Sequence, residues 1–290
     1  MQTNTKQALR ALIEARRGAL VPGAFNALSA RVIADLGFEA IYVTGAGVTN
    51  MHLGLPDQGF MGLAEIAEQT ARIRDAVELP LIVDADTGFG NALNVRHTIR
   101  MLERAGADCV QLEDQVSPKR CGHFSGKGVI DTAEMVGKIK AAVDARQDSG
   151  LLIMARTDAC SVYGFEAAIE RAQAFAEAGA DILFVEATET ADQIRALPKR
   201  LAPPQLMNMV IGGKTPIFDA DALGELGYGI VLYANAALQG ALVGMQRALT
   251  VLRDTRRIDE DPTLVAPFKE RQRLVGKPLL DALEQRYSVG

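Results

Sequence analysis

Four acidic side chains lie at or near the ends of short apolar segments. Asp84 and Asp86 end the segment LPLIVDAD, Glu113 ends CVQLE, and Asp57 lies in the nearby loop GLPDQG. Asp84 and Asp86 are separated by one residue, so on a strand both would point to the same face. Clustered carboxylates repel one another and shift one another's pKa values unless a cation neutralises them. Oxygen ligands without a cluster of His or Cys favour Mg2+, or Mn2+, over zinc.

Other apolar segments also end in polar side chains. Burying such groups without partners would cost on the order of several kcal/mol each. An arginine and amides beside carboxylates therefore predict that a hard cation and an anionic substrate meet at this place. The additional polar residues are Tyr42, Thr44, Asp114, Arg156, Asp158, Glu186, Asn208, Tyr233 and Asn235.

The segment PKRCGH predicts a reactive thiol. Cys121 follows a lysine and an arginine and precedes a glycine and His123, in a loop rich in glycine. Positive neighbours lower the pKa of a thiol, and such a group can exchange a proton near neutral pH. Cys109 and Cys160 are expected in strands, as buried structural thiols. The sequence thus assigns the chemistry to Cys121.

These residues require a frame that brings the ends of strands together. Eight short apolar runs recur, and segments with apolar residues every three or four positions, typical of half-buried helices, lie between them. Apolar strands followed by helices indicate a parallel sheet covered by helices. Eight units without a linker predict an α/β fold with one domain over 1–290, a (β/α)8 barrel whose strand ends converge on one mouth. The runs are ALVPGA, AIYVTGA, LPLIVDAD, CVQLED, LLIMARTD, ILFVEA, LMNMV and GIVLYAN.

Composition and charge exclude several classes of protein. The 290 residues are 48% hydrophobic and 23% charged, as in ordinary globular proteins, and the net charge of −5 argues against a nucleic-acid partner. No apolar run approaches the roughly 20 residues of a membrane span. The first segment lacks the features of a secretory signal, and three cysteines without metal-site spacing predict reduced thiols, hence a cytoplasmic protein.

Four motifs together carry a resemblance that runs from about Val21 to Tyr233. They are LPLIVDADTGFGNALNV, QLEDQVSPKRCGH, MARTDA and NMVIGGKTP. The chain resembles the isocitrate lyase and phosphoenolpyruvate mutase superfamily. This resemblance implies a Mg2+-dependent (β/α)8 barrel that acts on α-keto or α-hydroxy acids. It also implies a homotetramer, a dimer of dimers with a swapped last helix, which would account for the charged helical tail 262–290, expected on the barrel or on a neighbouring subunit.

The resemblance also implies roles for single residues. Asp84 and Asp86 match metal ligands, with Asp57 and Glu113 holding metal-bound waters. Cys121 matches a catalytic proton donor, and Tyr42 a base on the substrate hydroxyl. Arg156 would stabilise negative charge as it develops. The residues expected to contact substrate are Thr44, Gly45, Ala46, Gly122, His123, Arg156, Glu186 and Asn208.

The implied reaction is a retro-aldol or retro-Claisen cleavage of a substituted malate, such as 2,3-dimethylmalate or methylisocitrate. Gln239 stands where methylisocitrate lyases carry an arginine for a further carboxylate, and Ile211 replaces a residue that is polar in most relatives. Both changes favour a malate-type dicarboxylate, unless Arg271 in the tail supplies the missing positive charge. The alternatives are a carboxyphosphonoenolpyruvate phosphonomutase, an oxaloacetate decarboxylase or hydrolase, and a non-catalytic barrel.

Overall fold

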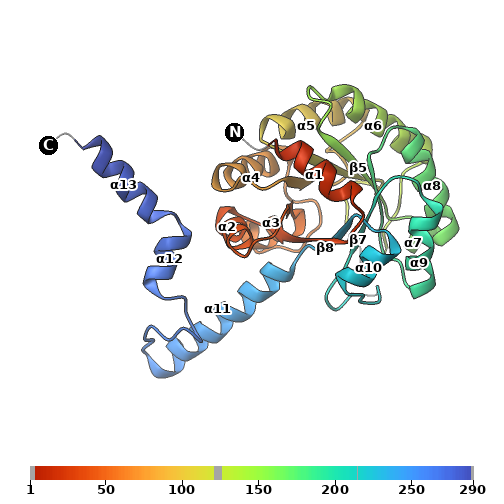
Figure 1. Cartoon of the computed structure of the whole chain (residues 1–290). Coiled ribbons are helices and arrows are strands. Elements are labelled where there is room, and N and C mark those ends of the chain that lie inside the picture. Colours follow the sequence, from red (N-terminus) through yellow and green to blue (C-terminus); the bar gives the residue numbers. More distant parts are fainter. Residues whose placement is uncertain (1–3, 121–125, 214, 289–290) are drawn as a thin grey trace.

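The computed structural model describes residues 4–120, 126–213 and 215–288. Eight parallel strands form a closed barrel in chain order, and β8 pairs with β1 (Figure 1). Each predicted apolar run contains one strand, except that β7 begins one residue before its run, so the (β/α)8 barrel is confirmed. The strands are β1 Ala19–Ala24, β2 Ile41–Val43, β3 Leu81–Asp84, β4 Cys109–Glu113, β5 Leu152–Thr157, β6 Ile182–Val185, β7 Gln205–Asn208 and β8 Ile230–Tyr233.

Helices surround the barrel, and side-chain caps set where several of them begin. The Asn91 side chain accepts hydrogen bonds from the backbone N–H groups of Leu93 and Asn94 at the start of α5, and Asn26 caps α2 in the same way. The helices up to β8 are α1 Thr5–Glu14, α2 Ala27–Asp35, α3 Gly45–Leu53, α4 Leu63–Ala76, α5 Ala92–Arg104, α6 Thr132–Ala145, α7 Cys160–Tyr163, α8 Phe165–Glu177, α9 Ala191–Arg200 and α10 Ala220–Leu226.

Two separate cores follow from the alternation of side chains along the strands. Residues such as Val83 and Val110 point outward and pack against the helices, whereas Ile82 and Cys109 fill the barrel interior. Leu9 of α1 is buried against the interior cluster and closes the N-terminal end of the barrel. The opposite, C-terminal end is the mouth, where the polar ends of the strands meet.

The chain after β8 leaves the barrel. Helix α11 (Ala236–Thr255) projects outward and has no buried residue, and Leu242 and Leu249 on it are exposed (Figure 1). The expected tail holds α12 (Phe268–Leu274) and α13 (Lys277–Tyr287), and Arg273 of α12 forms an ion pair with Asp35 of α2 at 2.6 Å. Within the described residues, no helix has both the length and the apolar character needed to cross a bilayer.

Candidate active site

A pocket at the mouth gathers most of the residues that the sequence singled out. Its wall also contains Ile211 and Gln239, the two positions that depart from the pattern of methylisocitrate lyases. Gly45 lies directly beside it, and Cys121, Gly122 and His123 lie outside the described residues. The predicted residues in the pocket wall are Tyr42, Thr44, Ala46, Asp57, Asp84, Glu113, Arg156, Glu186 and Asn208.

Asp84 and Asp86 come together, but not by strand alternation as the sequence suggested. Strand β3 ends at Asp84, and Asp86 lies beyond it with a φ of 47°, so its direction is set by a turn. The Asp86 backbone N–H donates to Asp84 Oδ1 at 3.2 Å, and the Gly45 N–H donates to Asp84 Oδ2 at 3.3 Å. A Cβ at Gly45 would lie 3.1 Å from Asp84 Oδ2 and 3.4 Å from Asp86 Oδ1, so the glycine keeps space open beside both carboxylates.

Lys119 lies among these acids. Its Nζ is 2.6 Å from Asp57 Oδ1 and 2.8 Å from Asp86 Oδ1. Burial opposes its charge, but the attraction of the carboxylates outweighs burial and holds the pKa of Lys119 well above its usual range. Burial raises the pKa of Asp86 to about 7 despite Lys119, with Asp84 adding to the shift. Among the described residues, no three His, Cys, Asp or Glu side chains are placed to hold one ion.

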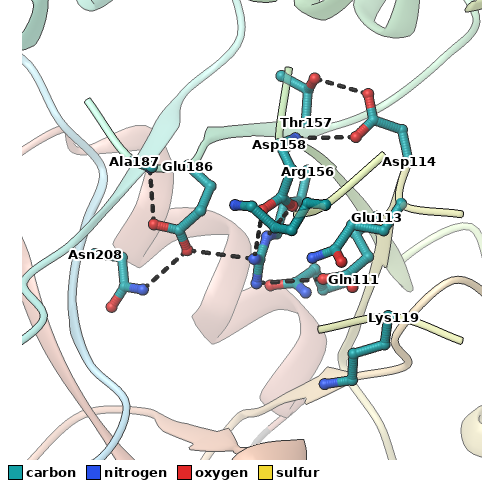
Figure 2. A network of polar contacts seen from close by, with 12 residues as sticks. Gln111, Glu113, Asp114, Lys119, Arg156, Thr157, Asp158, Glu186, Ala187 and Asn208 are labelled. Carbon is teal, nitrogen blue, oxygen red and sulfur yellow. Dashed lines mark hydrogen bonds and ion pairs between the residues drawn. The ribbon is translucent and has the colours of Figure 1, made fainter. Parts of the chain in front are cut away.

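Arg156 organises the opposite wall of the pocket (Figure 2). Its guanidinium binds Asp158 through two hydrogen bonds of 2.9 and 3.1 Å and lies 3.2 Å from Glu113 Oε2 and 3.5 Å from Glu186 Oε2. Asn208 Nδ2 donates to Glu186 Oε2 at 3.1 Å. Burial opposes the charge of Arg156, but Asp158 and Glu113 outweigh it, so its pKa lies well above the usual range and the cation is permanent.

Tyr42 and Gln111 form a contact that the sequence analysis missed. The Tyr42 hydroxyl donates to Gln111 Oε1 at 2.6 Å, and Gln111 Nε2 donates to Asp84 Oδ1 at 3.0 Å. Burial raises the pKa of Tyr42 well above its usual range, and Asp84 adds to the rise. The alternation in CVQLE, which places Gln111 on the face of Glu113, was the signal that could have revealed it.

Several polar atoms of the mouth are not satisfied. Glu113 Oε1 and Asn208 Oδ1 are buried and have no hydrogen-bond partner among the described residues. Lys119 and Arg156 each carry one positive charge and each contacts more than one carboxylate. Two cations are thus shared among a larger number of carboxylates, so the acids and the unpartnered oxygens are available to bind a cation or hydrogen-bonding groups from outside the chain.

The remaining predictions have mixed outcomes. The Thr44 side chain caps α3, accepting from the Gly47 N–H at 3.2 Å, so Thr44, Gly45 and Ala46, which were expected to contact substrate, form the start of a helix. Cys109 is buried in β4 as predicted. The strand position predicted for Cys160 is wrong, because β5 ends at Thr157 and Cys160 begins α7, where it is half-buried.

Comparison with known proteins identifies the family of this chain. The sequence model described as phosphoenolpyruvate phosphomutase matches residues 9–253. The chain is 41% identical to 2,3-dimethylmalate lyase of Eubacterium barkeri over 99% of each chain. It is 48% identical to 2-methylisocitrate lyase of Aeropyrum pernix, over 85% of this chain and 78% of that one. A crystal structure of 2,3-dimethylmalate lyase superposes with a TM-score of 0.92 at 33% identity, covering 99% of this chain and 96% of the other. This chain therefore belongs to the phosphoenolpyruvate mutase/isocitrate lyase superfamily.

Proposed function

We propose that this protein is a metal-dependent carbon–carbon lyase that cleaves an alkyl-substituted malate into a 2-keto acid and a carboxylate. The proposal rests on one pocket that combines three features: the acid cluster (Asp57, Asp84 and Glu113, with Asp86 beside them), the Arg156 cation and an apolar wall. Full-length similarity to 2,3-dimethylmalate lyase supports the same reaction class.

The acid cluster suits a hard divalent cation, for which we propose Mg2+, with Mn2+ as a substitute. The buried, unpartnered Glu113 Oε1 and the space kept open at Gly45 provide oxygen donors and room. Asp84 and Asp86 would hold the ion, and Asp57 and Glu113 would hold its water ligands. A bound Mg2+ supplies electrostatic stabilisation of the negative charge on the reacting acid.

The residues of this chain would bind and polarise the substrate as follows. The start of α3 would offer the backbone N–H of Ala46, which lines the pocket, to one substrate carboxylate. The N–H groups of Thr44 and Gly45 already donate to the Ala24 carbonyl and to Asp84, so these two residues would contact the substrate through their other atoms. Arg156, in the pocket wall, would stabilise the negative charge that develops as the C2–C3 bond breaks. The amide of Asn208, held by Glu186 on the same wall as Arg156, would orient the substrate. Gly122 and His123, next to the thiol in sequence, would complete the contacts.

The bond changes of this reaction balance without an oxidant or a second substrate. The substrate hydroxyl loses its proton to a base of the mouth, its oxygen forms the keto group, and the C2–C3 bond breaks. The electron pair moves to C3, beside the other carboxylate. Cys121 then gives C3 a proton, and Arg120 and His123, its neighbours in the sequence, would provide the positive surroundings.

The apolar wall indicates the substituents of the substrate. Met209, Val210 and Ile211 line the pocket beside Phe184, and Gln239 supplies no positive charge. A buried methylene contributes about 0.8 kcal/mol there, whereas an unpaired carboxylate costs on the order of several kcal/mol. A dialkylmalate therefore suits the pocket better than a tricarboxylate.

A substrate panel tests this proposal. We expect 2,3-dimethylmalate with Mg2+ to release a keto acid fastest, methylisocitrate at least about tenfold more slowly in kcat/KM, and no release with EDTA. Release from oxaloacetate or phosphonopyruvate alone would support the alternative activities and contradict this one.

The location and the assembly are part of the proposal. We propose a cytoplasmic homotetramer in which the chain after β8 packs on a neighbouring subunit. The exposed Leu242, Leu249 and Leu252 of α11 support this, because such a row of leucines is costly to leave in water. Light scattering of the full chain gives the mass of the assembly, and a monomeric mass would contradict it.

A further inference from the structure

Gln111 is a buried amide in the barrel interior, one level below the pocket. It lies on β4 with no exposed surface, and its neighbour across the sheet is Asp84 of β3. Glu113, two residues further, reaches the pocket wall, but Gln111 does not line it. Its side chain instead connects Tyr42 of β2 to Asp84 of β3 (Gln111 is labelled in Figure 2). Three neighbouring strands are thus joined by two hydrogen bonds.

The direction of these hydrogen bonds is fixed by Asp84. Both of its oxygens accept N–H groups: Oδ1 from the Asp86 backbone and Oδ2 from the Gly45 backbone. The Gln111 group that faces Asp84 Oδ1 must therefore be the NH2, because the amide oxygen would place two acceptors 3.0 Å apart. The amide oxygen then faces Tyr42, and the 2.6 Å contact requires the tyrosine hydroxyl to donate.

We propose that Gln111 is a positioning residue that makes Tyr42 a neutral hydrogen-bond acceptor toward the pocket and holds Asp84 in its orientation. Tyr42 lines the pocket, and its hydroxyl proton is donated to Gln111. The Tyr42 oxygen therefore presents only lone pairs to a ligand in the pocket. This inference rests on the proposed function in one respect: the donor that meets Tyr42 is the hydroxyl of a 2-hydroxy acid.

In this arrangement one group orients the substrate hydroxyl and a different group removes its proton. A phenol that already donates its proton to an amide oxygen cannot take up a second one, so Tyr42 orients the substrate hydroxyl. The proton leaves to one of the carboxylates of the mouth after rotation about the C–O bond. Burial raises the pKa of Tyr42 well above its usual range, which agrees with a neutral phenol. The assignment differs from the base role that the family resemblance implies for Tyr42.

The test uses Gln111→Met, which keeps the length of the side chain and removes both hydrogen bonds. The matched control is Gln205→Met, because Gln205 is also buried in a strand but bonds the backbone oxygen of Leu201 at the other end of the barrel. The first measurement needs no substrate: the resonance Raman tyrosine doublet, with Tyr42→Phe subtracted to isolate Tyr42. We expect a donating phenol in the wild type and in Gln205→Met, and loss of that signature in Gln111→Met.

The second measurement is kinetic. We expect Gln111→Met to lower kcat about 10- to 100-fold, and to lower it by a clearly smaller factor in a Tyr42→Phe background, because the two residues act together. Mn2+ binding, followed by electron paramagnetic resonance, should weaken in Gln111→Met and not in Gln205→Met. A role limited to barrel stability predicts equal losses in both backgrounds and unchanged Mn2+ affinity, and that result would overturn the proposal.

Failure of the proposed function gives a different pattern. If the wild type cleaves none of the 2-hydroxy acids, the Raman and Mn2+ measurements on the substrate-free protein still decide the direction of the hydrogen bonds. A phenol that accepts rather than donates in the wild type would overturn the inference, whatever the substrate.

Discussion

Acidic side chains lie at both ends of the barrel, but their partners differ. At the N-terminal end, Asp108 precedes β4, and its Oδ2 accepts from the Leu81 backbone at 2.8 Å and from Arg74 at 3.2 Å. Its Oδ1 accepts from the Thr5 hydroxyl at 2.5 Å. The carboxylate therefore joins α1, α4 and β3, and both of its oxygens are satisfied.

Asp181 repeats this arrangement two units later in the barrel. It precedes β6, and its Oδ2 accepts from the Ile153 backbone at 2.9 Å and from Arg146 at 3.0 Å. Its Oδ1 lies 3.5 Å from Arg10 of α1. Both aspartates end the sequence phrase AGAD, so one short motif builds the same brace twice. Asp108 and Asp181, at the N-terminal end of the barrel, therefore stabilise the fold.

The acids of the mouth are arranged differently. Glu113 Oε1 is buried and has no partner among the described residues. Lys119 is shared between Asp57 and Asp86. Such incomplete pairing costs stability, which a protein tolerates where a ligand completes the set. Asp108 and Asp181 each pair with an arginine, whereas Asp84 accepts only from neutral N–H groups among the described residues. The comparison teaches that pairing with a cation of its own, and not burial, distinguishes the structural acids from the proposed binding acids in this barrel.

The largest effect should come from Asp84→Ala at the mouth. We expect kcat/KM per folded molecule to fall by about 1,000-fold or more, because the proposed metal loses a ligand, while circular dichroism still shows a folded barrel. The thermal midpoint should fall as well, because the N–H groups of Gly45, Asp86 and Gln111 lose their acceptor. Steady-state keto-acid release measures the loss of activity, and circular dichroism measures the folded state of the variant. Full activity of the variant in EDTA would contradict the assignment of the acids of the mouth to metal binding.

Asp108→Ala should show the opposite pattern. Removing the carboxylate leaves Arg74 and the Leu81 N–H without this acceptor, so we expect the free energy of unfolding to fall by about 2–4 kcal/mol. The kcat/KM per folded molecule should be unchanged. The control is Asp148→Ala, an exposed acid of the same end paired with Lys6, which should cost less than about 1 kcal/mol. Urea unfolding measures both, and equal costs would contradict the proposed brace.

Gln239→Arg tests whether charge in the pocket wall selects between substrates. A cation in the pocket wall should raise kcat/KM for methylisocitrate relative to 2,3-dimethylmalate by about tenfold, equivalent to about 1.4 kcal/mol. Competition between the two acids gives this ratio directly. An unchanged ratio would show that Gln239 does not meet the substituent that distinguishes them.

The alkylation rates of the three cysteines also differ between the two ends of the barrel. Burial raises the pKa of Cys160, near the mouth, to about 11, and that of Cys109, at the start of β4, well above its usual range. Only the thiolate reacts, so below pH 11 the alkylation rate of Cys160 should rise about tenfold per pH unit. Peptide mapping at pH 8 should show Cys121 labelled first and Cys109 last. Alkylation of native Cys109 at the rate of Cys160 would contradict the order.

The sequence by itself determined the barrel and most of its pocket. Eight apolar runs matched eight strands because a parallel strand buried on both faces must be apolar along its length. Polar residues at the ends of those runs met at one mouth because the carboxyl ends of parallel strands share one edge. Tyr42, Asp84, Glu113, Arg156 and Glu186 could therefore be placed together without coordinates.

Only the tertiary structure decided which polar groups are paired. The spacing of Asp84 and Asp86 predicted a shared face, yet a left-handed turn at Asp86 makes the contact. Nothing in the sequence shows that Lys119 reaches Asp57 and Asp86, or that Gln111 joins Tyr42 to Asp84. Strand register and loop path set these contacts, since a hydrogen bond depends on a few tenths of an ångström between residues far apart in the chain.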